Sequence, residues 1–237
     1  TQEVNKHNKN YYVYDNPTIS DAEYDKLYDE LLALEKELNF SLPDSPTSRV
    51  GDDVLSKFEK RKHEFPLYSL NKVKDYSDLG KWITDMQNDS GRHDLDFSLE
   101  YKYDGLKVVL EYDGGRYKTA TTRGNGKIGE DVTLQVKTIR SVPMNIPFKK
   151  RLIVQGECMM TNKAFEEYNK TADIPLKNPR NGVAGAVRNL DPKETAKRKL
   201  DFFCYDISFV EDYEIKSQKD MHDFIVDQGF LTGDYFK

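Results

Sequence analysis

The sequence has little cysteine and no long apolar run. Its 237 residues contain two cysteines, too few for a disulfide framework or a four-cysteine zinc site, so Cys158 and Cys204 are expected to be buried as small apolar side chains. No apolar stretch approaches the roughly 20 residues of a membrane-spanning helix, and the polar N-terminus has no signal-peptide core. These absences disfavour a disulfide-stapled secreted domain and a membrane protein, and they predict a soluble, cytoplasmic chain.

An excess of positive charge is also missing. The chain has 36 Lys and Arg against 41 Asp and Glu, which gives a net charge of -5. This balance excludes an overall basic field of the kind that binds nucleic acid non-specifically, so any such contact must be local. The chain does have a hydrophobic fraction of 37%, enough to form a folded core.

A small helical domain is predicted at the N-terminus, over residues 1–55. Residues 21–38 place leucines and tyrosines at helical spacing, which predicts an amphipathic helix. Ser20 and Glu23 form the capping-box pattern at its start. An earlier short helix is expected to end near residues 11–14, before an Asn-Pro turn.

The remainder, residues 56–237, is predicted to be an α+β domain of antiparallel sheets flanked by helices. The charged stretch 57–62 is expected to link it to the helical domain. Apolar alternation and N-cap signals indicate strands over residues 95–101, 107–112, 116–122, 152–155 and 202–209, and helices over residues 161–170 and after Asn178-Pro179.

A lysine string is the first candidate for chemistry. If residues 95–101 form a strand, alternation directs Glu100, Lys102 and Asp104 toward one face. The simplest interpretation is a lysine–aspartate pair beside a turn. A lysine amine attacks phosphorus only when neutral, and at an ordinary pKa of about 10.4 roughly one in a few thousand is neutral at pH 7. Activation therefore needs burial or nearby cations. The candidates for those cations are Lys107, Arg123, Arg180 and Arg188.

The second string, residues 122–131, contains a G-x-G-x-x-G pattern after a strand. A dinucleotide-binding fold would require an acidic residue about 20 positions further on. There is no Asp or Glu from residue 132 to residue 156. A flexible hairpin loop is therefore favoured.

Two more strings follow. Glu157, after Gln155 and Gly156, could accept hydrogen bonds from a ribose, although a solvated glutamate at a strand end is the commoner case. Arg180 and Arg188 would share one stripe of a helix, at a spacing suited to phosphate oxygens. Glycines within that helix would instead indicate close backbone packing.

In this order and spacing, the four strings resemble the nucleotidyltransferase core of NAD-dependent DNA ligases, which implies an ATP-grasp-like fold. The resemblance covers nearly the whole chain. Residues 11–25 resemble the small N-terminal domain that binds nicotinamide mononucleotide (NMN), which only the NAD-using branch carries. Residues 44–51 and 63–71 resemble the segments that lead into the adenylation domain.

The resemblance implies that Lys102 attacks the adenylyl phosphorus of NAD, releasing NMN and leaving lysyl-AMP, the first step of nick sealing. Glu100 and Asp104 would assist. Mg²⁺ is implied as a second cofactor, with no protein-only metal site. A monomer is expected, whose partners are NAD, AMP, NMN and, in the full-length enzyme, nicked DNA. The implied binding residues are Tyr11, Tyr12, Asp21, Tyr24 and Asp25 for the NMN half, and Ser69, Leu70, Glu100, Arg123, Glu157, Arg180 and Arg188 for the nucleotide and phosphates.

Several positions depart from the family pattern. Gln155 stands where arginine is usual, Asn125 where aspartate is usual, and Lys107 where alanine is usual, which indicates a divergent member, such as a viral one. The family continues beyond Lys237 with further lysines, a DNA-binding barrel, a zinc module and helical repeats. This chain is therefore not expected to seal nicks unaided.

Two alternatives remain open at this point. One is an ATP-dependent nucleotidyltransferase of the same superfamily, such as an RNA ligase or a capping enzyme, against which residues 11–25 argue. The other is a nucleotide- or protein-binding module that has lost activity. Formation of lysyl-AMP would separate an enzyme from such a module.

Overall fold

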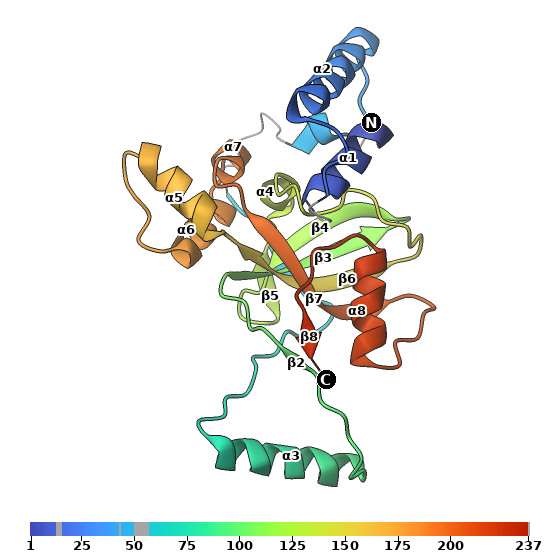
Figure 1. Ribbon diagram of the computed structural model, residues 1–237, viewed down its shortest axis with the longest axis vertical. Helices are drawn as coiled ribbons and strands as arrows, with labels where there is room; N and C mark the ends of the chain where they lie inside the picture. Colours follow the sequence, from blue (N-terminus) through green and yellow to red (C-terminus); the bar gives the residue numbers. More distant parts are fainter. Residues whose placement is uncertain (13–15, 43, 50–56, 237) are drawn as a thin grey trace.

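The helical unit at the N-terminus is confirmed. A computed structural model describes residues 1–12, 16–42, 44–49 and 57–236 (Figure 1). Helices α1 (Gln2–Tyr12) and α2 (Asp21–Leu38) are followed by the short 3-10 helix η1 (Pro46–Arg49). Ser20 and Glu23 form the predicted reciprocal capping box at the start of α2. The predicted domain boundary at residues 55 and 56 falls within residues 50–56, which lie outside the described part.

The second unit is built on a four-stranded antiparallel sheet, in the order β4-β3-β6-β7. Gly114 and Gly115 form the β3–β4 turn with φ angles of 60° and 77°, which a two-residue hairpin of this kind requires. The mixed α+β class is therefore confirmed. The strands are β3 (Leu106–Asp113), β4 (Arg116–Thr122), β6 (Leu152–Met159) and β7 (Asp201–Val210).

One face of this sheet is buried under helices and forms the core. Alternation along β3 places Val108, Leu110 and Tyr112 on that face, all with no exposed surface. Both cysteines, as expected, are buried there as free thiols. The helices of this unit, apart from one described below, are α4 (Thr133–Lys137), α5 (Asn162–Thr171), α6 (Pro179–Val187), α7 (Pro192–Ala196) and α8 (Gln218–Asp227).

The predicted linker over residues 57–62 is wrong. Its second half is strand β1 (Lys60–Lys62), which pairs antiparallel with β5 (Ile128–Glu130). The charges that indicated a linker are instead matched across this pair, because Lys60 reaches Glu130 and Arg61 reaches Asp131. The stretch therefore belongs to the second unit.

The predicted strand over residues 95–101 is mostly wrong. It contracts to β2 (Leu99–Glu100), which pairs with β8 (Tyr235–Phe236) and not with β3. Leu99 is 70% exposed, so the apolar alternation here does not reflect a buried face. Helix α3 (Tyr76–Ser90), which was not predicted, extends away from the sheet in Figure 1 and buries none of its residues.

Candidate functional site

The lysine turn lies between β2 and β3. Lys102 and Asp104 are both exposed and neither is in a strand, so alternation does not place them as predicted. Gly105 is buried, and a Cβ there would collide with the Cys158 carbonyl oxygen, so only glycine allows the turn to lie this close to β6. Arg180 Nη1 lies 2.9 Å from Asp104 Oδ1, which joins α6 to the same turn. The turn is thus held between β6 and α6.

Glu157 lies beside the turn, within β6 and not at a strand end. Burial raises its pKa, and the Gly105 N–H together with three cations partly offsets this. A partly buried carboxylate surrounded by positive charge is suited to accept hydrogen bonds from a bound hydroxyl group. The cations that act on Glu157 are Lys102, Lys107 and Arg180.

Strand β7 adds two groups that the sequence reasoning missed. Burial raises the pKa of Tyr205, and the nearby Glu157 carboxylate adds to this shift. Lys107 Nζ lies 5.6 Å from the centre of the Tyr205 ring, and burial lowers the pKa of Lys107. Burial raises the pKa of the neighbouring Asp206. Alternation was the available signal, since the buried Phe202 and Cys204 leave Tyr205 on the opposite face.

The glycine-rich string is a hairpin loop, as predicted. Gly124 and Gly126 have φ angles of 55° and 88°. The flanking strands β4 and β5 belong to different sheets and are joined by one antiparallel bridge, Thr121 to Asp131, so this string does not form the parallel strand–helix–strand unit of a dinucleotide-binding fold. Arg123 Nη2 donates to Ser69 Oγ at 2.7 Å, and the Leu67 N–H donates to the Gly126 carbonyl at 2.9 Å. The loop therefore meets the segment that carries Ser69. Leu70, by contrast, is 74% exposed.

The helix after Asn178 is confirmed as α6, with Arg188 as its C-cap. Arg188 does not join Arg180 at the lysine turn. Instead its Nε and Nη2 donate to the Glu130 carboxylate at 2.9 and 3.2 Å. Gly182 packs closely, because a Cβ there would lie 2.7 Å from Leu176 Cδ1. The two arginines therefore have different partners in this structure.

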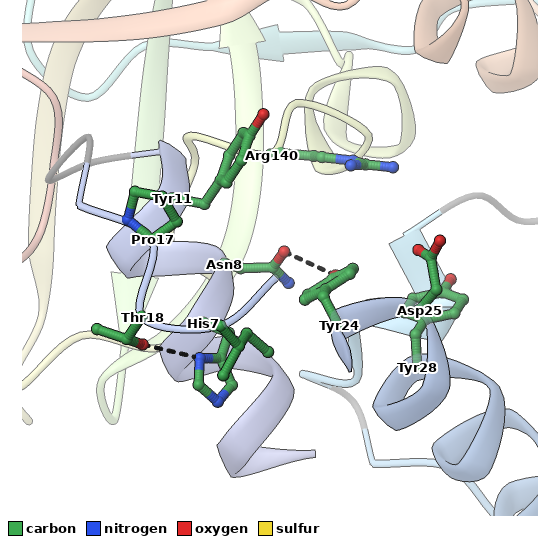
Figure 2. Close-up of a pocket in the computed structure, with 10 residues that line it drawn as sticks. His7, Asn8, Tyr11, Pro17, Thr18, Tyr24, Asp25, Tyr28 and Arg140 are labelled. Carbon is green, nitrogen blue, oxygen red and sulfur yellow. Dashed lines mark hydrogen bonds between the residues drawn. The ribbon is translucent and has the colours of Figure 1, made fainter. Parts of the chain in front are cut away.

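A separate cavity of about 460 Å³ lies between α1 and α2 (Figure 2). Tyr24 Oη donates to Asn8 Oδ1 at 2.8 Å, and His7 Nδ1 lies 3.2 Å from Thr18 Oγ1. His7 and Asn8 are more than nine-tenths buried, although polar. The lining residues are His7, Asn8, Tyr11, Pro17, Thr18, Ile19, Tyr24, Asp25, Tyr28 and Arg140.

Three of the predicted NMN residues line this cavity, namely Tyr11, Tyr24 and Asp25. The side chains of the other two, Tyr12 and Asp21, lie outside the described part of the structure. The sequence reasoning missed the polar residues of α1 and the distant Arg140. Figure 1 shows α1 and α2 on one side of the sheet and β2, which leads into the Lys102 turn, toward the other side, so the structure does not bring α1 and α2 to this turn.

Two protein-family models match the two regions of this chain. A family model described as the NAD-dependent DNA ligase adenylation domain matches residues 55–237, about three quarters of the chain. The chain belongs to this family. A second model, the DNA ligase-like, N-terminal NAD+-binding domain, matches residues 1–51.

Curated relatives that are similar to nearly the whole chain carry the name DNA ligase. The chain is 48% identical over 237 residues to a DNA ligase of Alkaliphilus oremlandii (strain OhILAs) and 45% identical over 243 residues to one of Finegoldia magna (strain ATCC 29328 / DSM 20472 / WAL 2508). Both alignments cover 99% of this chain, but only 36% and 37% of the relatives. The chain thus spans just over a third of their length.

Two of the departures from the family pattern have structural explanations. Gln155 Nε2 donates to Asp206 Oδ2 at 3.0 Å and to Ser208 Oγ at 2.9 Å, so it ties β6 to β7. Asn125 Oδ1 accepts from the N–H groups of Lys127 and Ile128 at 3.0 and 2.9 Å, a role that an aspartate could also fill. Neither departure leaves the side chain without partners.

Proposed function

We propose that Lys102 is the nucleophile that accepts the adenylyl group of NAD. The neutral Nζ attacks the adenylyl phosphorus, an N–P bond forms, and the bond from that phosphorus to the bridging oxygen breaks. NMN leaves with the electron pair, and the nitrogen releases its remaining surplus proton to solvent or to a nearby carboxylate. Asp104 and Glu100 are the carboxylates nearest in sequence to Lys102.

The observation that supports this proposal is the position of the lysine turn against β6 and α6. Gly105 allows the turn to lie against β6, and Glu157 lies there with cations from three different elements. Phosphoryl-type transfer depends mainly on positioning and on positive charge that stabilises the transition state. Lys102 itself is exposed, so the activation that we propose comes from the other two cations and not from burial. These are Lys107 of β3 and Arg180 of α6.

The remaining nucleotide residues fit the adenosine and phosphate part of NAD. We assign Glu157 to a ribose hydroxyl, and Arg123 with Ser69 to the sugar-phosphate, since these two already meet at 2.7 Å. Leu70 would lie beside the nucleotide. Arg188 would have to leave Glu130 to reach a phosphate. The finer assignment to the ATP-grasp-like nucleotidyltransferase fold belongs to the same proposal.

The helical unit would hold the NMN half of NAD. Its cavity offers tyrosine faces and the Asp25 carboxylate, which suit a cationic pyridinium ring. Because Figure 1 shows α1 and α2 on one side of the sheet and β2, which leads into the Lys102 turn, toward the other side, the helical unit must reorient before one NAD can reach both. Tyr12 and Asp21 are proposed for the same half. The match to an NAD+-binding domain favours NAD over ATP.

Mg²⁺ is proposed as a cofactor that binds with the phosphates. The described residues contain no cluster of three or more His, Cys, Asp or Glu side chains that could hold a metal ion. An ion here would therefore be coordinated mainly by phosphate oxygens and water, as Mg²⁺ commonly is. When bound, it would neutralise charge on the phosphates.

Nick sealing, nicked DNA as a partner, a monomeric state and a cytoplasmic location are proposals for the whole protein. Relatives of more than twice this length carry the printed name DNA ligase. Among the helices that the structure describes, none is both long and apolar enough to cross a membrane.

The test is intact-protein mass spectrometry of variants after incubation with NAD and Mg²⁺. Lys102→Ala is expected to abolish the AMP adduct without loss of folding, whereas Lys118→Ala should retain it. Lys118 is a matched control because it is a surface lysine that pairs with Asp113 on the β3–β4 hairpin. An adduct that persists on Lys102→Ala would overturn the assignment.

A further inference from the structure

The lysine turn carries a tyrosine, Tyr103, between Lys102 and Asp104. Tyr103 is partly buried, and its ring packs on the Phe203 ring of β7 with centroids 4.9 Å apart. Its hydroxyl group lies against Gly233, where a Cβ would collide with Tyr103 Oη. The absence of a side chain at residue 233 is therefore what leaves room for the tyrosine in this position.

Gly233 belongs to a short segment, residues 231–236, that connects the central sheet with β2 and is called the strap below. At the start of the strap, the Cys204 N–H of β7 donates to the Leu231 carbonyl at 2.8 Å. The end of the strap is β8, which pairs antiparallel with β2 directly before the lysine turn (Figure 1). Between these points, His222 Nε2 of α8 lies 2.8 Å from the Gly233 carbonyl oxygen. The strap is thus joined to β7, α8 and β2.

The backbone of the lysine turn is anchored on both sides of Lys102. Before Lys102, Glu100 of β2 pairs with β8, and its Oε1 accepts from Gln218 Nε2 of α8 at 2.6 Å. After Lys102, Tyr103 is held by β7 and the strap, and Gly105 lies against β6. Because consecutive Cα atoms are only about 3.8 Å apart, these anchors restrict the backbone of Lys102 even though its side chain is exposed.

We infer that Tyr103 is a positioning residue, because its ring, held between Phe203 and the strap, fixes the backbone of Lys102 for attack. The inference rests on the proposed function, which makes Lys102 the nucleophile. A displacement of about 1 Å in a reacting group can lower a rate about a hundredfold. Tyr103 acts through Lys102 and not through a contact with NAD. Loss of its ring should therefore lower the maximal rate of adenylation and leave the NAD concentration at half-maximal rate unchanged.

Single-turnover mass spectrometry of the AMP adduct, over a range of NAD concentrations with Mg²⁺, tests this inference. Tyr103→Ala is expected to lower the maximal rate at least about tenfold and to leave the NAD concentration at half-maximal rate within about twofold. Tyr103→Phe keeps the ring and should stay within about twofold of the wild-type rate. Tyr213→Ala is a matched control that should change neither value, because it removes a tyrosine ring that packs on Phe148 and Phe224, outside the turn and the strap.

A second pair of variants separates positioning from a loss of folding. Gly233→Ala should slow adenylation at least about fivefold, because the new Cβ collides with Tyr103 Oη and displaces the ring. In the double variant Gly233→Ala/Tyr103→Phe that oxygen is gone and the nearest ring carbon is 2.9 Å from the Cβ, so the rate should return to within about threefold of wild type. Equal rates in Tyr103→Ala and wild type, or a double variant as slow as Gly233→Ala alone, would overturn the inference.

Failure of the proposed function would give a different result. If the wild-type chain formed no adduct, or if Lys102→Ala kept it, the assignment of Lys102 would fail. Amide hydrogen exchange would then still report on the anchoring of the turn, because the Gly105 N–H donates to Glu157. Tyr103→Ala should speed exchange of this N–H, whereas Tyr213→Ala should not. Unchanged exchange in Tyr103→Ala would overturn the anchoring itself.

Discussion

The two units of this chain bury different kinds of side chains. In the described part of residues 1–49, Val4 and Leu31 are the buried aliphatic side chains, while His7, Asn8, Ser45 and Arg49 are buried polar ones. The second unit buries a large apolar cluster against its sheet, and a smaller separate one around Val109 and Ile153. An apolar interior stabilises a fold by itself, whereas buried polar groups must find partners. The helical unit is therefore expected to depend more on docking and on ligand for its stability.

A core truncation should have the largest effect on stability. Phe202 has no exposed surface, and its ring packs edge-on to Phe230 with centroids 6.4 Å apart. Phe202→Ala should lower the free energy of unfolding of the second unit by about 3–5 kcal/mol, measured by urea denaturation. Tyr76→Ala, at a side chain that is 91% exposed, should stay within about 0.5 kcal/mol. Equal effects would contradict the account of the core.

Arg49 of η1 joins the helical unit to the second unit, because it donates from Nη1 to the Ile139 carbonyl at 2.8 Å and from Nη2 to the Val142 carbonyl at 3.1 Å. Loss of this arginine should act on the helical unit alone. Burial lowers the pKa of Arg49 to about 10, so its hydrogen bonds partly offset a desolvation penalty. Arg49→Met should cost about 2 kcal/mol in docking, seen as faster amide hydrogen exchange in α1 and α2 with unchanged exchange in β3 and β6. A uniform change across both units would show that docking and core stability are not separate.

The smallest effect is expected from a pH series on Glu157. Because burial raises its folded pKa above the unfolded value, the ionised carboxylate lowers stability at neutral pH. Glu157→Gln should therefore be more stable than wild type at neutral pH. This advantage should shrink as the pH falls through the raised pKa and vanish below the ordinary carboxyl range, as followed by thermal melts. An advantage that does not change with pH would contradict the burial argument.

Elements with strong periodicity or capping signals were predictable from the sequence. The capping box before α2 and the turn glycines between β3 and β4 are local signals that tertiary contacts did not override. Helix α3 was missed, although Asp75 caps it, because none of its residues is buried in the core. Strand β1 was missed because its charged side chains find their partners about 70 residues away.

The residues of the candidate site were likewise predictable from the sequence only in part. Lys102, Glu157 and Arg180 were found by their motifs, and the structure brings them together. Tyr205 was missed because an aromatic side chain in a strand also fits a core position. Arg140 could not be found from local pattern at all, because its place depends on Arg49 reaching carbonyl groups about 90 residues further along the chain.

The central claim is that the lysine turn carries the chemistry while the helical unit selects NAD. The most direct test is intact-protein mass spectrometry after incubation with Mg²⁺ and either NAD or ATP, on wild type and Asp25→Ala. The account predicts an AMP adduct from NAD but not from ATP, and an adduct from NAD that forms at least about tenfold more slowly in Asp25→Ala. An adduct from ATP, or an unchanged rate in the variant, would contradict it.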